Sequence, residues 1–218
     1  MYADSSQMLA KKKQTASIVC IVAAVLLAAS LFLPWLKSNK SMGLSMSLLT
    51  MKQCGGGRCE SMSNLKMARE IDKAYDEAAA AVREWSRDSG DAPDLPKKPG
   101  TSFAYFGLIT LALCLLAAAV MLAAGILGLK GKFVRSPIAL STVGLLAACL
   151  GLITGCIFVA VKPGDMGPMR TLGVSWPFFL FGAAVVGGVA GCQMLAKAFG
   201  PPEYDPYADP TLPPQPPM

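Results

Sequence analysis

Residues 54–59 read Cys-Gly-Gly-Gly-Arg-Cys and lie in a polar loop, residues 37–101, between two long apolar segments. Cys54 and Cys59 are the only paired cysteines outside the apolar segments. The three glycines permit positive φ angles and a tight chain reversal. A loop on the extracytoplasmic side of a membrane lies in an oxidising compartment. We therefore predict a disulfide, Cys54–Cys59, that closes a small ring. Metal binding and redox exchange are the alternatives, and the loop contains no histidine to support a metal site.

The apolar residues, 53% of the 218-residue chain, gather in four blocks. Each block provides the roughly 20 helical residues that cross a hydrocarbon core. Asp, Glu, Arg and His are absent from all four, and Lys197 lies in the last turn of the fourth, where it can reach the interface. The pattern predicts an all-α membrane protein, a four-transmembrane-helix bundle with a small extracytoplasmic subdomain. The predicted spans are Ala16–Leu36, Ser102–Leu129, Pro137–Val161 and Trp176–Phe199.

The first apolar block also has features of a secretory signal peptide. Three lysines at 11–13 precede an apolar run and small residues, which is the usual order in such a leader. Apolar residues continue through 31–36, however, and give a full-length span with Trp35 near its end. We therefore expect an uncleaved first helix.

Basic residues beside the apolar blocks predict the orientation of the chain. Lysines 11–13 precede the first block, and Lys130, Lys132 and Arg135 lie between the second and third. Positive residues at short flanks remain cytoplasmic, and the aromatic residues gather at the other ends of the spans. The predicted cytoplasmic segments are 1–15, 130–136 and 200–218, and the outer loops are 37–101 and 162–175. Both termini are expected in the cytoplasm, of either a bacterial inner membrane or a eukaryotic plasma membrane.

The formal net charge of +6 could also indicate nucleic-acid binding. Much of that excess belongs to the lysines that flank the spans, and no nucleic-acid-binding motif accompanies it. The charge therefore predicts a membrane topology, and no nucleic-acid partner is expected.

Two periodic patterns lie within the large loop. Met42, Leu44, Met46 and Leu48 alternate with small polar residues, which is typical of a half-buried β-strand. From residue 62 to 88, apolar residues recur at three- and four-residue spacing and predict an amphipathic helix. Its opposite face is too charged to cross a bilayer, so we expect the apolar stripe to pack on the strands, the membrane surface or a partner. The candidate partner-binding residues are Leu65, Ile71, Tyr75, Val82 and Trp85.

Small residues repeat every four positions in the third and fourth spans. That spacing places them on one helix face, where two backbones can approach closely in lipid. Packing within the chain is the simpler interpretation, and a homodimer face is the alternative. The predicted helix-packing residues are Ala147, Gly151 and Gly155 in the third span, and Ala183, Gly187 and Gly191 in the fourth.

The sequence contains no catalytic motif. Histidine, the usual general base and metal ligand, is absent. The carboxylates of the large loop are spaced as on a solvated helix face, and the other five cysteines lie in apolar blocks, where cysteine acts as a small apolar residue. We expect no enzymatic activity, no cofactor and no bound metal.

Two alternative functions remain compatible with the sequence. A passive channel could form by oligomerisation, although the spans lack the interior ionisable residues of pumps and coupled carriers. Extracytoplasmic Cu(I) binding is a weaker alternative, because five methionines surround the cysteine pair and thioethers favour Cu(I). These methionines are Met42, Met46, Met51, Met62 and Met67.

The C-terminal segment is rich in proline. It contains Pro-Pro-Glu-Tyr at Pro201–Tyr204, which matches the Pro-Pro-x-Tyr ligand of WW domains and has polyproline geometry as its physical basis. A segment of this composition cannot build a core, so we expect a solvated tail with one candidate ligand motif.

The order of segments resembles the claudin and peripheral-myelin-protein family. That family has a Trp at the end of the first span, then Gly-Leu-Trp and a disulfide-bonded cysteine pair. Trp35, Gly43-Leu44 and Cys54/Cys59 occur in that order here, with Ser45 in place of the second Trp. The resemblance implies a left-handed four-helix bundle with a small outer sheet that functions through protein contacts.

Taken together, these patterns predict a structural or accessory membrane protein. The large loop has a closed tip and an amphipathic helix, and the chain lacks catalytic groups. We expect this loop to engage a protein partner or a second copy of the chain, while the spans contact the lipid bilayer.

Overall fold

The structure is a computed structural model that describes residues 2–38, 43–89, 98, 100–130, 137–161 and 171–199. Most of the turn predicted at 130–136, most of the second outer loop and the tail motif Pro201–Tyr204 lie outside the described residues. Met42 of the predicted strand and Lys132 and Arg135 of the predicted basic turn also lie outside them.

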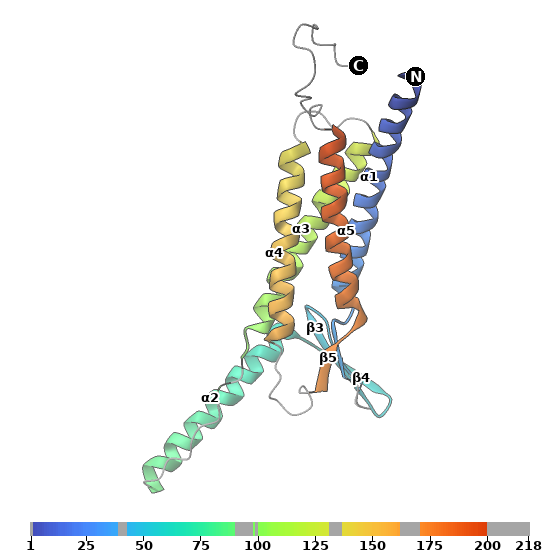
Figure 1. Cartoon of the computed structure of the whole chain (residues 1–218). Helices are drawn as coiled ribbons and strands as arrows, with labels where there is room; N and C mark the ends of the chain where they lie inside the picture. The colour runs from blue at the N-terminus through green and yellow to red at the C-terminus, as the bar shows by residue number, and fades with distance from the viewer. Residues whose placement is uncertain are drawn as a thin grey trace.

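Four long helices form the body of the molecule (Figure 1). Helix α3 packs along α4, and α1 packs along both α5 and α3. Among the described residues, four helices are long and apolar enough to cross a membrane, which confirms the number of predicted spans, and each helix overlaps one of them. The helices are α1 (Tyr2–Phe32), α3 (Phe103–Leu129), α4 (Pro137–Ala160) and α5 (Trp176–Phe199).

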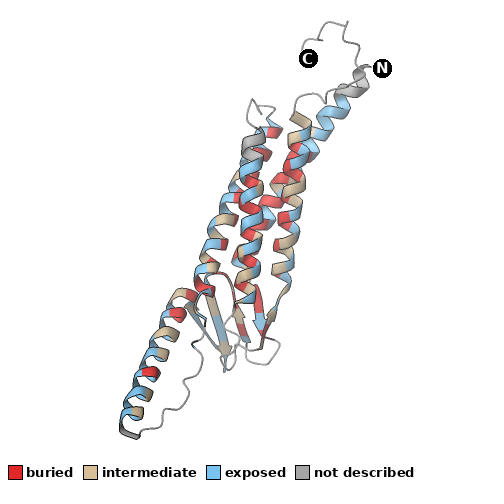
Figure 2. Cartoon of the chain, turned by 60° about the vertical axis from the view of Figure 1, so that its left-hand side comes forward, coloured by how far each residue is buried: buried red, intermediate tan, exposed pale blue. Residues whose placement is uncertain are grey.

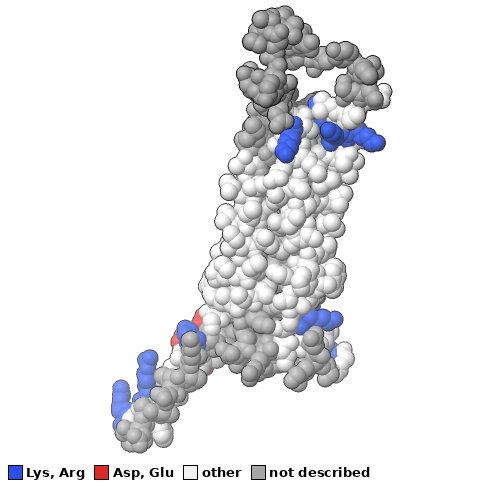
Figure 3. All heavy atoms as spheres, in the orientation of Figure 1, with Lys and Arg blue, Asp and Glu red and all other residues white. Residues whose placement is uncertain are grey.

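The outer surface of this bundle is apolar. Only 33% to 44% of the most apolar stretch of each helix is buried within the chain. Buried residues face the neighbouring helices, whereas large side chains such as Leu115, Ile153 and Val186 are exposed (Figure 2). In the space-filling view, Lys and Arg lie towards the two ends and the middle of the face is uncharged (Figure 3). An apolar surface of this extent requires lipid around it, so the chain is an integral membrane protein.

A five-stranded antiparallel sheet covers one end of the bundle, which we call the sheet end (Figure 1). The strand order is β4-β3-β2-β1-β5. The first four strands come from the large loop, and β5 comes from the segment before α5, so the sheet joins the two loops. The strands are β1 (Leu36–Ser38), β2 (Gly43–Met46), β3 (Thr50–Gly55), β4 (Arg58–Ser63) and β5 (Leu172–Val174).

The alternation predicted for the start of the loop produces strand β2. Leu44 and Met46 lie in this strand and are buried, while Gly43 is exposed and Ser45 is half-buried. Leu48, two residues after the strand, is also fully buried. The period-two pattern therefore buries one face of the sheet against the helices, as expected for a sheet that covers an apolar core.

Helix α1 differs from its predicted bounds at both ends. It begins at Tyr2, so most of the predicted lead 1–15 continues the membrane helix, because the segment is rich in Ala, Lys and Gln and contains no Gly or Pro. It ends at Phe32, and Leu36, the predicted last residue of the span, already belongs to β1. Pro34 explains this early end, since proline provides no N–H and disfavours a helical residue before it.

Helix α2 (Asn64–Ser89) follows β4 directly and extends away from the sheet end of the bundle (Figure 1). Its first turn is capped, because the hydroxyl of Ser63 accepts a hydrogen bond from the backbone N–H of Lys66 (3.2 Å). The exposed ion pairs Lys66–Glu70 and Lys73–Glu77 lie along its polar face. The helix predicted at 62–88 is therefore present within two residues of the predicted bounds.

Candidate partner-binding surface

The sheet is attached to the bundle through Trp35. This side chain is fully buried, and its Nε1–H donates a hydrogen bond to the carbonyl of Ser30 (2.8 Å). Its ring lies at the junction of the first, fourth and fifth helices, with centroid distances of 6.1 Å to Phe158, 5.4 Å to Phe178 and 4.6 Å to Phe181. The point at which the chain leaves α1 is thus fixed by four aromatic rings.

The two loops form a single unit beside Trp35. The backbone N–H of Ser175 donates to the Trp35 carbonyl (2.8 Å), and the Ser175 hydroxyl donates to the carbonyl of Pro34. Further along β1, the hydroxyls of Ser38 and Thr171 are 2.7 Å apart. These bonds hold β5 against β1, so the sheet is anchored to both α1 and α5.

The disulfide predicted from the sequence is confirmed, and it joins β3 to β4. Cys54 pairs with Cys59 across the ladder, and their sulfur atoms are bonded. Gly56 and Gly57 form the two-residue turn with φ angles of +58° and +80°. Positive φ at both turn positions is the geometry of a type I′ hairpin, which glycine adopts without strain. The result is a short, covalently closed hairpin whose residues are mostly exposed.

Asn64 fixes the start of α2 against the turn between β2 and β3. Its Nδ2 group donates hydrogen bonds to the carbonyls of Ser47 and Leu48 (both 2.9 Å), and its backbone N–H donates to Leu49 (2.8 Å). Asn64 is 2% exposed. No local sequence pattern indicates this role, because an Asn near a helix start can form several local hydrogen bonds and Leu48 is 16 residues away.

The five predicted partner-binding residues divide into two groups along α2. Leu65 and Ile71 are partly buried and pack against the hydrophobic core. Tyr75 and Val82 are half-buried, and Trp85 is 55% exposed. The first group therefore attaches α2 to the bundle, whereas the second group is not among the residues packed against the core.

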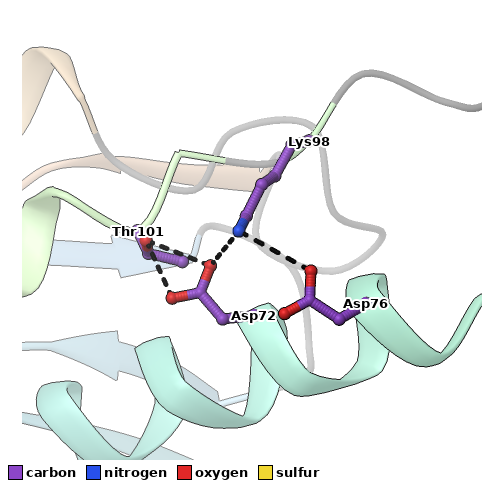
Figure 4. Close-up of polar contacts among 4 residues, drawn as sticks. All are labelled: Asp72, Asp76, Lys98 and Thr101. Carbon is purple, nitrogen blue, oxygen red and sulfur yellow. Dashed lines mark hydrogen bonds and ion pairs between the residues drawn. The ribbon is translucent and has the colours of Figure 1, made fainter. Parts of the chain in front are cut away.

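A small polar cluster links α2 to the chain that leads back into α3 (Figure 4). Lys98 Nζ lies 3.0 Å from Asp72 Oδ1 and 4.0 Å from Asp76 Oδ1, and it lies 5.7 Å from the ring centre of Tyr75. The hydroxyl of Thr101 donates to the carboxylate of Asp72 at 3.3 Å and 3.5 Å. Asp72 thus accepts bonds from two residues that precede α3.

The charges of this cluster affect the titration of Lys98. Its hydrogen bond to Asp72 is the main cause that raises the pKa of Lys98 above the ordinary value for lysine. A raised pKa in the folded chain means that Lys98 is fully protonated below the ordinary lysine pKa, as the ion pair with Asp72 requires. Its contribution is lost only as the pH rises from that value through the raised pKa, so the cluster is intact at neutral pH.

We expect Asp72→Asn to loosen this link. The neutral amide keeps the shape of the side chain but removes the ion pair with Lys98 and weakens the bond from Thr101. Amide hydrogen exchange around residues 98–101 and at the adjacent turn of α2 should become severalfold faster. Asp76→Asn is the matched control, because Asp76 is more exposed and its 4.0 Å contact with Lys98 is longer. Equal acceleration in both variants would contradict the role assigned to Asp72.

The small residues predicted on α4 lie inside the bundle. Ala147 is 5% exposed, and an added Cβ at Gly151 would lie 2.5 Å from the Sγ atom of Cys114 on α3. At Gly155, an added Cβ would lie 3.1 Å from the ring of Trp35. Gly151 and Gly155 therefore lie against other segments of the same chain, and Ala147 is buried within it.

On α5, the residues that pack most closely differ in part from those predicted. Gly191 lies against Cys20 of α1, where an added Cβ would be 2.8 Å from Sγ. Gly187 is half-buried, and Ala183 is exposed. Gly188, which was not predicted, packs more closely than Gly187, because an added Cβ at Gly188 would lie 2.5 Å from the side chain of Met121 on α3. Since α5 contacts both α1 and α3, its small residues occupy two adjacent faces rather than one.

The methionine and cysteine side chains near the hairpin contribute to packing or to the disulfide. Met46 and Met67 are buried in the core, and Met51 and Met62 pack against it. The sulfurs of Cys54 and Cys59 are bonded to each other, so neither is a thiolate ligand in the oxidised chain. Within the described part of the chain, no three His, Cys, Asp or Glu side chains come together as a metal site.

These features define a class of protein by its architecture. The chain is an integral membrane protein whose four helices carry, at one end, an antiparallel sheet closed by a disulfide and a projecting amphipathic helix. Comparison of the chain with protein-family models and with curated proteins finds no match. The function is therefore inferred from the geometry of the sheet end.

Proposed function

We propose that this protein is a non-enzymatic structural or accessory membrane protein that engages a protein partner through the sheet and α2. The observation that carries this proposal is the projection of the second half of α2 beyond the bundle, with Val82 and Trp85 on its apolar stripe (Figure 1). An amphipathic helix gains most of its stability from packing of its apolar face. A partner that covers this face would supply that packing.

The outer edge of the sheet is a second part of the proposed partner-binding surface. Strand β4 is the last strand on its side, and within the described residues no further strand pairs with its outer edge. A free strand edge can accept an added strand from another chain. Because α2 follows β4 directly, the helix and the strand edge together offer one continuous contact region to a protein partner.

The proposed topology places this region outside the cytoplasm. Three lysines, Lys11, Lys12 and Lys13, lie in the N-terminal part of α1, and Lys197 lies in the last turn of α5, opposite the sheet end. Positive residues beside a span remain in the cytoplasm. A disulfide on the other side agrees with an oxidising compartment. The buried Trp35, the sheet and the closed hairpin also support the proposed likeness to the claudin and peripheral-myelin-protein family, which functions through protein contacts.

The test introduces a charge on each of two opposite faces of α2. Val82→Asp places a carboxylate on the apolar stripe, and Ala80→Asp places the same charge about 160° around the helix. We expect Val82→Asp to lower the partner affinity about tenfold or more and Ala80→Asp to leave it unchanged. The thermal unfolding midpoint of the bundle should be the same in both variants, since both positions lie beyond the part of α2 that packs on the core.

A photo-crosslinking residue at position 82, compared with position 80, identifies what covers the stripe in native membranes. Crosslinks to a second polypeptide from position 82 alone would support the proposal, and crosslinks to a second copy of this chain would make the partner a homo-oligomer. Crosslinks to lipid alone would show that α2 lies on the membrane surface and would overturn the proposal.

A further inference from the structure

A groove lies between α1 and α5 at the end of the bundle opposite the sheet. Its volume is about 640 Å³, which lies within the range of sites for small molecules. It is formed where the first turns of the apolar part of α1 meet the last turns of α5. The lining residues are Met8, Leu9, Lys11, Lys12, Thr15, Met194, Lys197 and Ala198.

Three lysines are among the residues that line this groove. Lys11 and Lys12 come from α1, and Lys197 comes from the last turn of α5. Lys13 has a different position, with its Nζ atom 4.6 Å from the ring centre of Phe199. Among the described residues that line the groove there is no Asp or Glu, and none occurs in residues 7–32 or 176–199. The described groove therefore carries a positive charge that its own lining does not neutralise.

The floor of the groove is apolar. Met8 is 58% exposed, Leu9 is 47% exposed and Met194 is 52% exposed. The hydroxyl of Thr15 donates to the carbonyl of Lys11 (2.9 Å), so its proton is already used within α1. The lysines therefore provide the charged recognition, and the remaining surface is suited to hydrocarbon. These residues lie at the ends of the spans Gln7–Phe32 and Trp176–Phe199, where the membrane interface is expected.

We infer that this groove binds an acidic phospholipid. The lysines contact the phosphate and the acidic headgroup, and the acyl chains lie on the apolar floor and continue along the lipid-facing surface of α1 and α5. Basic pockets between transmembrane helices recognise anionic headgroups in this way. The three charges come from two different helices, so a bound lipid would also link α1 to α5. This inference does not depend on the proposed partner surface at the other end of the bundle.

A soluble phosphate would not use the apolar floor. A second occupant to consider is the C-terminal segment, which follows α5 and contains Glu203, Asp205 and Asp209. This segment is rich in proline and carries acidic residues, so it matches the charge of the groove, but it has no side chain as long as an acyl chain for the floor. The lipid satisfies both properties of the groove, and the experiment below separates the three occupants.

The test uses the full chain in a neutral detergent, titrated with phosphatidylglycerol or with phosphatidylcholine of the same acyl chains and measured by native mass spectrometry. We expect the wild type to prefer the acidic lipid about tenfold. Lys11→Gln/Lys12→Gln/Lys197→Gln should remove this preference. The control Lys37→Gln/Lys52→Gln/Lys66→Gln removes three exposed lysines at the sheet end and should retain it.

Three results would overturn the inference. Equal loss of preference in the two triple variants would indicate general electrostatic attraction. Displacement of the lipid by inorganic phosphate at similar concentrations would assign the groove to a free anion. A preference that is absent in the wild type and appears only in Glu203→Gln/Asp205→Asn/Asp209→Asn would assign the groove to the C-terminal segment. Thermal unfolding of each variant shows whether the fold is intact and keeps these outcomes interpretable.

Discussion

Trp35→Ala is expected to destabilise the bundle by about 3–5 kcal/mol, the largest effect of any single substitution considered for this chain. The side chain is fully buried and contacts Phe158, Phe178 and Phe181 on two other helices. Its removal would leave a cavity where α1 changes into β1, because the surrounding rings can fill the space only in part. The measurement is the free energy of unfolding in detergent.

The control for this prediction is another tryptophan of the same chain. Trp176 is 65% exposed, so Trp176→Ala should change the stability by about 0.5 kcal/mol or less. Trp35→Phe separates packing from hydrogen bonding, since it keeps a ring but removes the bond to the Ser30 carbonyl, and it should cost about 1 kcal/mol. If Trp35→Ala and Trp176→Ala lowered the stability equally, Trp35 could not be the junction between the bundle and the sheet.

Gly107→Ala is expected to cost about 1–3 kcal/mol, although it adds only one methyl group. Gly107 lies on α3 against the turn between β2 and β3, where an added Cβ would overlap with the carbonyl oxygen of Leu48 and approach Phe158 at 3.3 Å. The obstacle at Leu48 is backbone, so no side-chain rotation relieves it. The same carbonyl accepts a hydrogen bond from Asn64, and its displacement should also loosen the start of α2.

Gly182→Ala provides the matched control for Gly107→Ala. Gly182 lies within α5, and an added Cβ there would meet nothing within 4 Å. Alanine is a better helix former than glycine, so this variant should be neutral or more stable by up to about 1 kcal/mol. Amide exchange at Asn64–Ile71 should accelerate only in Gly107→Ala. Unchanged exchange in that variant would mean that α3 and the turn do not support α2.

The contacts that attach α2 to the bundle also position the proposed partner-binding surface. Its first turns are held by Asn64, Leu65 and Ile71, and the cluster around Asp72 holds the next turn. The apolar stripe continues beyond these contacts on the part of α2 that extends away from the bundle (Figure 1). A partner surface of this kind requires that the attachment be rigid and that the distal part remain accessible.

The candidate site could be predicted from the sequence only in part. The spacing of apolar residues predicts the helix and its stripe, but it cannot show which residues of the stripe pack on the same chain. Leu65 and Ile71 have the same local pattern as Val82, and they differ only in their distance from the bundle. The contributions of Asn64 and Lys98 depend on partners many residues away, so no local pattern indicates them.

The sequence by itself determined the four membrane spans, the disulfide, strand β2 and the amphipathic helix. Each of these depends on local composition or on short spacings, because a span needs about 20 apolar residues and a strand or helix face has a fixed period. The tertiary structure alone decided the strand order, the union of the two loops through β5, and the use of Gly188 beside Gly191 on α5. The tertiary structure also brings Lys11, Lys12 and Lys197 together at one groove. The physical reason is that these features arise from contacts between segments far apart in the chain, and side-chain packing between helices selects them.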